Sequence, residues 1–141
     1  MSEPDERQRQ NIELARRGLD AFAQGDLETV LTVISEEVEV FSSPELMNAG
    51  THRGHDGFLD WTEEWVDAWE GLDLEVNSIE PVGDSYVIAA VRQRARGRAS
   101  GVEVEMDVAF IFQADGSRCV FLGLLPDPES ALELVRAREA A

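Results

Sequence analysis

Residues 86–125 constrain the fold most strongly, because this stretch alternates apolar runs with two short turn sequences. Asp115-Gly116 lies between two apolar runs. Such a pair is a strong signal for a tight β-hairpin, because glycine tolerates the positive φ that the turn demands. Ala99-Ser100-Gly101 gives a second, weaker turn signal. The stretch therefore predicts three long antiparallel strands, at residues 86–98, 102–115 and 119–125.

The charges of the first two strands predict how these strands pair. If Ala99-Ser100 is a two-residue loop, three arginines face three acids across the strands: Arg96 opposite Glu103, Arg94 opposite Glu105 and Arg92 opposite Asp107. Each cross-strand pair of opposite charges contributes roughly 0.2–1 kcal/mol to stability. A shift by one residue would place each arginine against an apolar neighbour and mix the two faces. We therefore predict this register, with the charged residues on the outer face of the sheet.

The opposite face of these strands is apolar almost throughout, and we predict that it is the inner face. Gln93 is its one strongly polar side chain in the long strands. With Asp115-Gly116 as a second two-residue loop, the third strand continues this face through the pairs Phe112–Cys119, Phe110–Phe121 and Val108–Gly123. The outer face then carries apolar residues at one end, namely Ile88, Ile111, Val120 and Leu122. A monomer does not need so much outer apolar surface, so we predict a homodimer through this face.

The residues outside this stretch predict four helices and two further strands. Apolar positions at helical spacing predict helices at residues 5–23, 27–35 and 55–71, and a C-terminal helix begins at Asp127 or Pro128. Residues 37–42 and 72–82 predict strands, and residues 43–54 form the longest irregular segment. Helices followed by a run of antiparallel strands indicate an α+β protein. We expect one domain over residues 1–141, with its core at about 8–135.

The composition excludes several classes of function. A net charge of −17 argues against binding nucleic acid or an anionic membrane, both of which need basic patches. No apolar run approaches the roughly 20 residues of a membrane span. The first six residues are acidic and polar, unlike a signal peptide, and the single cysteine allows no internal disulfide. We expect a cytoplasmic protein that binds neither nucleic acid nor membrane.

Four short motifs carry a resemblance to a known superfamily. They are Gln24-Gly25-Asp26-Leu27 followed by the strand at 35–40, Arg53-Gly54-His55-Asp56-Gly57, the hairpins at 94–101 and 115–118, and Asp127-Pro128-Glu129. They resemble the nuclear transport factor 2-like superfamily, in particular its SnoaL-like, or polyketide cyclase-like, branch. The resemblance implies a cone-shaped, strongly curved, mostly antiparallel sheet. It also implies three N-terminal-half helices on the concave face, a short C-terminal helix, a pocket inside the cone and, usually, a homodimer through the outer sheet face.

The chemistry of individual members does not transfer readily to this chain. Ketosteroid isomerases place a tyrosine and a base where this sequence has Gly18 and Ser42, and neither residue can perform those roles. Enzymes that resemble limonene epoxide hydrolase activate water with an Asp–Arg–Asp set across neighbouring strands, which Arg92 and Asp107 could imitate only from the inner face. The resemblance therefore predicts the fold more specifically than the function.

The two histidines are the natural candidates for acid–base chemistry near neutral pH. His52 lies in the irregular segment, where it could close over the mouth of a pocket or simply be exposed. His55 is expected to flank the third helix. His52-x-x-His55 with Asp56 is a weak metal motif without a further clustered ligand, so we predict no metal and, without a glycine-rich phosphate loop, no cofactor.

The predicted pocket lies between the inner sheet face and the third helix, where ligand sites are mostly apolar with few polar groups. Its predicted lining is Ser42, His52, Trp61, Trp65, Gln93, Met106, Val108 and Phe110. Gln93 either binds a ligand or bonds Ser42 or water, since a buried amide needs partners. Cys119 lies on the apolar face and is expected to remain an unreactive thiol.

Three functions remain open on the sequence alone. The first is a domain that binds a small hydrophobic molecule and has no complete catalytic set. The second is an enzyme of cyclase, isomerase or epoxide-hydrolase type that uses His52, or Asp107 with Arg92, as acid and base. The third is a non-catalytic dimerisation module, in which Trp61, Trp65 and Phe110 fill the pocket. The first two are distinguished by whether an ionisable group points into the cavity.

Overall fold

The computed structural model of the chain describes residues 3–46 and 49–141, except for the side chains of Trp65, Val66 and Ala68. The elements follow the order α1 (Glu6–Ala23), α2 (Leu27–Val33), β1 (Ile34–Ser42), β2 (Gly50–Arg53), α3 (Gly54–Ala68), β3 (Trp69–Val82), β4 (Tyr86–Gly97), β5 (Glu103–Asp115), β6 (Arg118–Leu125) and α4 (Pro128–Ala140). The strands form one sheet in the order β2-β1-β6-β5-β4-β3, in which only β1 and β6 are parallel. The predicted α+β class is confirmed.

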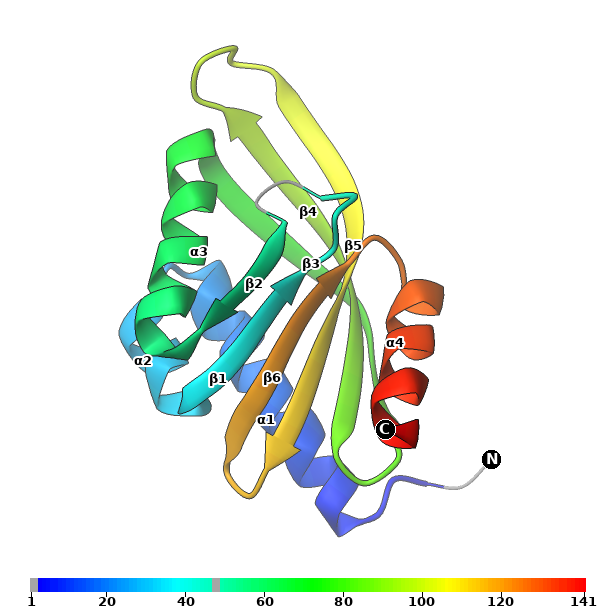
Figure 1. The fold of residues 1–141 in the computed structure, drawn as a ribbon. Helices are drawn as coiled ribbons and strands as arrows, with labels where there is room; N and C mark the ends of the chain where they lie inside the picture. The colour runs from blue at the N-terminus through cyan, green and yellow to red at the C-terminus, as the bar shows by residue number, and fades with distance from the viewer. Residues whose placement is uncertain (1–2, 47–48) are drawn as a thin grey trace.

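The sheet separates two apolar clusters. Helices α1, α2 and α3 cover its inner, concave face, and α4 packs on the outer face (Figure 1). The inner cluster includes Leu19 of α1, Val30 of α2 and Trp61 of α3, together with sheet residues such as Phe110. The space between the inner sheet face and α1–α3 is called the interior below. No helix among the described residues combines the length and apolar character needed to cross a bilayer.

Aspartates define where three of the helices begin. Asp5, Asp26 and Asp127 each precede a helix and accept a hydrogen bond from the backbone N–H three residues later. This bond satisfies one of the donors that a helix start leaves without an intrahelical partner. Hydrogen bonds from Thr29 lower the pKa of Asp26, and hydrogen bonds from Ser130 lower the pKa of Asp127. The N-termini of α1, α2 and α4 are therefore encoded locally.

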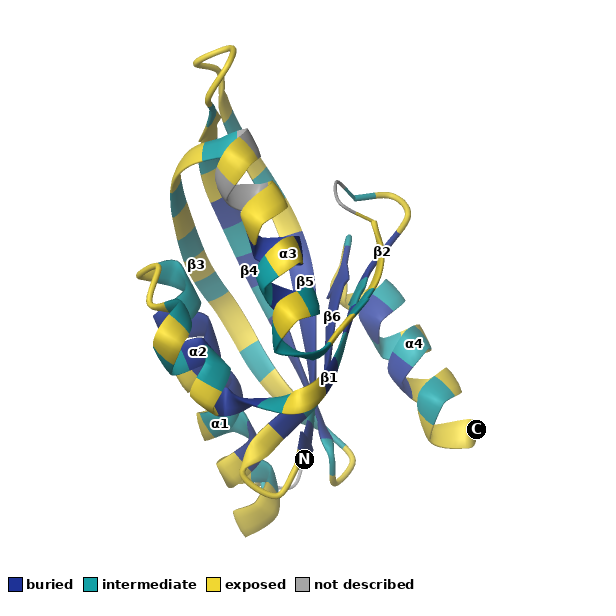
Figure 2. Ribbon diagram, turned by 60° about the vertical axis from the view of Figure 1, so that its left-hand side comes forward, coloured by how far each residue is buried: buried dark blue, intermediate teal, exposed yellow. Residues whose placement is uncertain are grey.

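The predicted register of β4 and β5 is confirmed. Arg92 lies opposite Asp107, Arg94 opposite Glu105 and Gln93 opposite Met106. Arg92 Nε donates to Asp107 Oδ1 at 2.9 Å, and Arg94 Nε donates to Glu105 Oε2 at 3.2 Å. Figure 2 shows that the tip of this hairpin is exposed and that burial increases toward the middle of the sheet. The charge pairs thus mark the outer face, as the sequence predicted.

The predicted register of β5 and β6 is wrong. Phe112 pairs with Leu122 and Phe110 with Leu124, whereas the hairpin turn predicted Cys119 and Phe121 in these places. Asp115 pairs with Arg118, so the two-residue loop is Gly116-Ser117 instead of the predicted Asp115-Gly116. The register shifts again between the pairs Gln113–Phe121 and Ala114–Cys119, so Val120 is an extra residue in β6. Such a bulge moves the following side chains to the opposite face. Leu122 and Leu124 therefore belong to the inner cluster, and Phe121 belongs to the outer one.

Two element boundaries also differ from the prediction. Residues 50–53 form β2, which pairs antiparallel with β1, in the segment that we expected to be irregular. The third helix ends at Ala68, and Trp69 is the first residue of β3 instead of a helical residue. The chain therefore passes from α3 into β3 without a loop, and Trp69 lies opposite Gly97 at the start of a sheet edge.

Helix α4 covers the apolar end of the outer sheet face. Ala131 and Val135 of α4 pack in one buried cluster with Ile88, Ile111 and Phe121 of the sheet. Of the four outer residues that suggested a partner subunit, Ile88 and Ile111 are covered by α4, whereas Leu122 was placed wrongly and lies on the inner face. The homodimer stays a prediction, but it no longer follows from uncovered apolar surface at this position.

Arg138 fastens the C-terminal turn of α4 to the sheet. Its guanidinium carbon lies 3.7 Å from the centre of the Phe121 ring, a cation–π geometry. The same guanidinium donates to the hydroxyl of Tyr86 at 3.1 Å and to the side-chain oxygen of Gln113 at 3.2 Å. One side chain thus joins α4 to β4, β5 and β6.

Candidate functional site

The bottom of the interior is filled by apolar side chains. A cavity of about 30 Å³ remains there, lined by Gly18, Leu19, Phe22, Val30, Val33, Ile34, Phe58, Trp61, Phe110, Phe112 and Leu122. Trp61 stacks on Phe22 with ring centres 6.2 Å apart and also contacts Phe58. Trp61 and Phe110 therefore occupy this part of the predicted pocket instead of lining a large opening. Trp65, another residue of that prediction, lies outside the described side chains.

The sheet carries one buried amide further toward the hairpin. Gln93 is 5% exposed, and no described residue makes a hydrogen bond with its side chain. It borders a cavity of about 10 Å³ together with Trp69, Ala95, Val104 and Met106. Unpaired buried polar groups are rare in native proteins, and each one calls for an explanation such as a bound water or a functional role. The structure thus places Gln93 and Met106 together as predicted, whereas Val108 is packed in the core.

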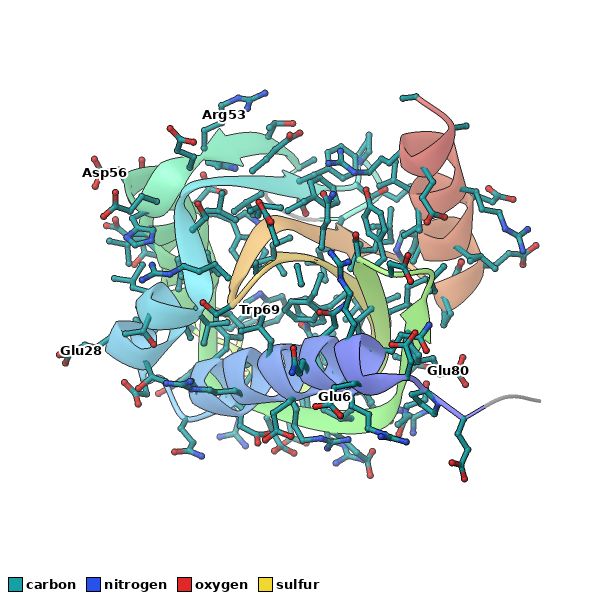
Figure 3. All side chains as sticks on the ribbon, turned by 90° about the horizontal axis from the view of Figure 1, so that it is seen from below. Glu6, Glu28, Arg53, Asp56, Trp69 and Glu80 are labelled. Carbon is teal, nitrogen blue, oxygen red and sulfur yellow. The ribbon has the colours of Figure 1, made fainter. Side chains whose placement is uncertain are left out.

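A larger cleft opens beside this small cavity. It has a volume of about 340 Å³ and lies between the end of α1, the middle of α3 and the start of β3. Its lining residues are Phe22, Ala23, Gln24, Gly25, Leu27, Thr62, Trp69, Gly71, Leu72 and Arg98. Trp69 lines both the cleft and the Gln93 cavity, and Figure 3 shows it within the curve formed by the sheet and α1. The cleft is large enough for a small ligand, since ligand pockets begin at about 300 Å³.

Ser42 and His52 lie at the opposite edge of the sheet, on β1 and β2. Ser42 is fully buried, and its hydroxyl has no hydrogen-bond partner among the described residues. His52 pairs with Val40, and its buried Nδ1 likewise has no partner in that part of the chain. Residues directly opposite in a sheet share a face, so His52 lies on the inner side with Val40, against Gly57 of α3. Ser42 and Gln93 do not bond each other, which was one of the predicted alternatives.

The structure contains no metal centre within the described residues. No three His, Cys, Asp or Glu side chains gather there in a way that could hold an ion. His55 Nε2 lies 3.1 Å from the carbonyl oxygen of Ile34, so this ring ties α3 to the start of β1. The sequence-predicted role of His55 as a flank of the third helix is confirmed.

Arg92 and Asp107 form a pair on the outer face, away from the interior. Their side chains are 39% and 66% exposed. The hydrogen bond from Arg92 lowers the pKa of Asp107, and the same bond raises the pKa of Arg92. Both groups stay charged and in contact with water, so the pair forms no site that excludes solvent from a reacting molecule. The structure thus does not place these residues where the epoxide-hydrolase alternative requires them.

Cys119 is a structural thiol. It is fully buried, and its sulfur donates to the backbone carbonyl of Phe121 at 3.1 Å. Burial raises the pKa of the Cys119 thiol to about 12, so the thiolate that a nucleophile requires is not formed near neutral pH. The expectation of an unreactive cysteine is confirmed.

The cleft itself was not predicted from the sequence. Its residues come from α1, the start of α2, α3, β3 and the tip of the β4–β5 hairpin, most of which are distant in the chain. Trp69 follows Trp61 and Trp65 at helical spacing and falls within the helix predicted at residues 55–71, so it was not predicted as a site residue. Gly71, at which the sequence ended the predicted helix, lies within β3 with a φ of +66°, three residues after the helix ends at Ala68.

Comparisons with known proteins agree with this fold. The family model of the SnoaL-like domain matches residues 15–121. Bal32a, from a soil-derived mobile gene cassette, is 21% identical, with a TM-score of 0.76 over 84% of this chain and 89% of that one. A candidate SnoaL-like polyketide cyclase from Jannaschia sp. CCS1 is 12% identical, with a TM-score of 0.79 over 94% and 95%. TerC, co-crystallised with polyporic acid, is 18% identical, with a TM-score of 0.74 over 90% and 98%.

At these identities the structural neighbours show the fold alone, and no curated protein matches the sequence. The family model, however, spans most of the 141 residues, from the middle of α1 into β6. The chain therefore belongs to the SnoaL-like domain family, within the nuclear transport factor 2-like superfamily.

Proposed function

We propose that this domain binds a small, uncharged and largely apolar molecule in the interior, with the Gln93 amide as its polar anchor. The observation that carries the proposal is the burial of Gln93 without a hydrogen-bond partner among the described residues, on a sheet face that is otherwise apolar. A fully buried amide without a partner costs roughly 1–3 kcal/mol, and Gln93, at 5% exposure, carries part of this cost. A ligand carbonyl or hydroxyl that pairs with the amide would remove this cost.

The lining of the interior supports an uncharged ligand. The cavities beside Gln93 and Trp61 are bordered by no Asp, Glu, Lys, Arg or His among the described residues. A charged group would lose its hydration in these two cavities without gaining an opposite charge, although the cleft outside them has Arg98 in its lining. The net charge of −17 further disfavours an anion. Two structures that share this fold, TerC and a protein from Catenulispora acidiphila, contain polyporic acid and trimethylamine, so the fold accommodates small molecules.

The same lining favours binding over catalysis. General acid–base chemistry needs a titratable group within hydrogen-bonding reach of the reacting atoms. His52, with its buried and unpartnered Nδ1 on the inner side of β2, is the one observation that favours an enzyme as a second candidate. In that case the ligand extends from Gln93 to the β1–β2 edge, and Ser42 and His52 contact its far end.

A charge series of probes tests the proposal. We expect 2-naphthol, which is neutral at pH 7, to quench the tryptophan fluorescence saturably. We expect it to bind at least tenfold more tightly than 2-naphthoate or 2-naphthylmethylamine, which share its ring system. The variant Gln93→Met, which keeps the volume and removes the amide, should weaken 2-naphthol binding about tenfold, the value of one hydrogen bond to a buried group. Ser42→Ala shows whether the ligand reaches β1.

Two results would contradict the proposal. One is the absence of saturable binding by any of the three probes to a folded wild-type protein. The other is tight binding that Gln93→Met leaves unchanged, because the amide would then have no part in recognition.

A further inference from the structure

Trp69 separates the open cleft from the buried amide. Its side chain borders the 340 Å³ cleft on one side and the Gln93 cavity on the other. It is half-buried and packs against the inner cluster. A molecule that enters the cleft therefore meets Trp69 before it reaches Gln93.

The space beside Gln93 is too small for any ligand as it stands. The cavity measures about 10 Å³, and even one water molecule needs roughly 10–15 Å³ of such space. The other side chains that border it are Ala95, Val104 and Met106, of which only Met106 is large and flexible. A ligand of useful size can thus contact the Gln93 amide only if Trp69 gives up the volume of its indole ring.

The surroundings of Trp69 permit such a movement. The residue opposite it in β4 is Gly97, which adds no side chain beside the indole. The pairing of β3 with β4 is irregular immediately afterwards, between Glu70 and Asp73. On the cleft side, Phe22, Leu27 and Leu72 offer an apolar surface against which a displaced ring can pack. The indole thus has an alternative position that does not leave it in water.

We propose that Trp69 is a gate between the cleft and the interior, and that the ligand replaces its indole beside Gln93. This inference rests on the proposed function and adds an entry route and a ligand class. The class is a flat, neutral molecule or group about the size of two fused rings, with one hydrogen-bonding atom for the amide. The rings of the ligand take the space that the indole leaves, while the indole packs in the cleft on Phe22 and Leu72.

The first test needs no ligand. The protein is labelled with 5-fluorotryptophan, and its ¹⁹F resonances are assigned with Trp61→Phe, Trp65→Phe and Trp69→Phe. Gating predicts that the Trp69 resonance shows microsecond-to-millisecond exchange, which relaxation dispersion detects, while the packed Trp61 does not. A Trp69 resonance free of exchange would overturn the gate, whatever the protein binds.

The second test uses the rate of 2-naphthol binding in stopped flow. For the wild type, the observed rate should level off with rising probe concentration at the rate of gate opening. Trp69→Phe and Trp69→Ala should remove the plateau and raise the rate at least tenfold, whereas Trp61→Phe, the matched change in the packed interior, should keep it. Binding that is equally fast in the wild type and both Trp69 variants would overturn the gate and leave the proposed function standing. The Gln93→Met variant tests the proposed function separately, because it removes the amide that anchors the ligand and leaves Trp69 unchanged.

Discussion

The two faces of the sheet differ in whether their polar side chains have hydrogen-bond partners among the described residues. On the outer face, Arg138 bonds Tyr86 and Gln113, and the arginines of β4 pair with acids of β3 and β5. On the inner face, the Ser42 hydroxyl is fully buried without a hydrogen-bond partner among the described residues. The Gln93 side chain, on a residue that is 5% exposed, makes no hydrogen bond to these residues either. Polar groups that serve the fold are paired within it, so the unpaired ones point to a partner from outside the chain.

This difference makes the two faces distinguishable by mutation. Removing a paired group from the outer face should destabilise the protein, because its partners lose a bond. Removing an unpaired group from the inner face should stabilise the protein, because a buried desolvation cost disappears. A residue at a ligand site can lower the stability of the free protein because it serves binding, which is a common trade-off between stability and function. The following variants test whether the faces differ in this sign.

Arg138→Ala should have the largest effect. It removes the ring contact with Phe121 and the hydrogen bonds to Tyr86 and Gln113, and we expect a loss of roughly 2 kcal/mol in the free energy of unfolding by urea. Arg136→Ala, an exposed arginine on the same helix, is the matched control and should change stability by less than about 0.5 kcal/mol. Equal effects of the two variants would show that the network does not fasten α4.

Gln93→Met should have a smaller effect of opposite sign. The variant removes an unpaired amide and retains an unbranched side chain beside Met106, so we expect roughly 1 kcal/mol of added stability. Ser42→Ala should stabilise by a similar or smaller amount, since its hydroxyl is also buried and unpartnered. Urea unfolding in ligand-free buffer measures the change in the free energy of unfolding for both variants. A clear loss of stability in Gln93→Met would mean that the amide is paired in the folded protein.

Arg94→Gln should have little effect, although Arg94 lies near three acids. The distances from its guanidinium to Asp73, Glu75 and Glu105 are 3.2–3.6 Å, but all four side chains are about half exposed or more. Exposed ion pairs contribute about 0–1 kcal/mol, and salt screens them. We expect a loss below about 1 kcal/mol that shrinks further in 1 M NaCl. A larger, salt-independent loss would show that the charged ladder holds the hairpin together.

The smallest effect concerns pH and the pair of Arg92 and Asp107. The pKa of Asp107 is lower in the folded protein than its ordinary value of 3.8, so protons bind more readily to the unfolded chain. The stabilisation is therefore complete above the ordinary pKa and is lost as pH falls below it, through the folded value. The difference in stability between the wild type and Asp107→Asn should be constant above about pH 5 and should shrink below about pH 4. A difference that grows on acidification would contradict this sign.

The sequence predicted the parts of the fold that depend on residues close together in the chain or opposite each other in one hairpin. The β4–β5 register follows from alternating arginines facing alternating acids, and the helix starts follow from capping aspartates. The β5–β6 register could not be predicted, because Cys119, Val120, Phe121 and Leu122 are all apolar, so no alternation reveals the bulge at Val120. The switch from α3 to β3 at Trp69 was hidden in the same way by continuous helical spacing of tryptophans.

The candidate site was predictable only in part. Gln93 stood out as a polar residue on an apolar face, and its burial confirms that position. The cleft depends on five elements that meet only after folding, and the covering of the outer face by α4 depends on contacts across the whole chain. Local patterns predict which face a residue occupies, whereas these features depend on which elements meet there.

A crystal structure of the protein in complex with 2-naphthol tests the central claim most directly. We predict electron density for the naphthol ring in the place of the Trp69 indole, its oxygen within hydrogen-bonding distance of the Gln93 amide, and Trp69 turned into the cleft. A structure in which the naphthol lies elsewhere, with Trp69 unmoved and the Gln93 amide bonded to another protein group, would contradict the account.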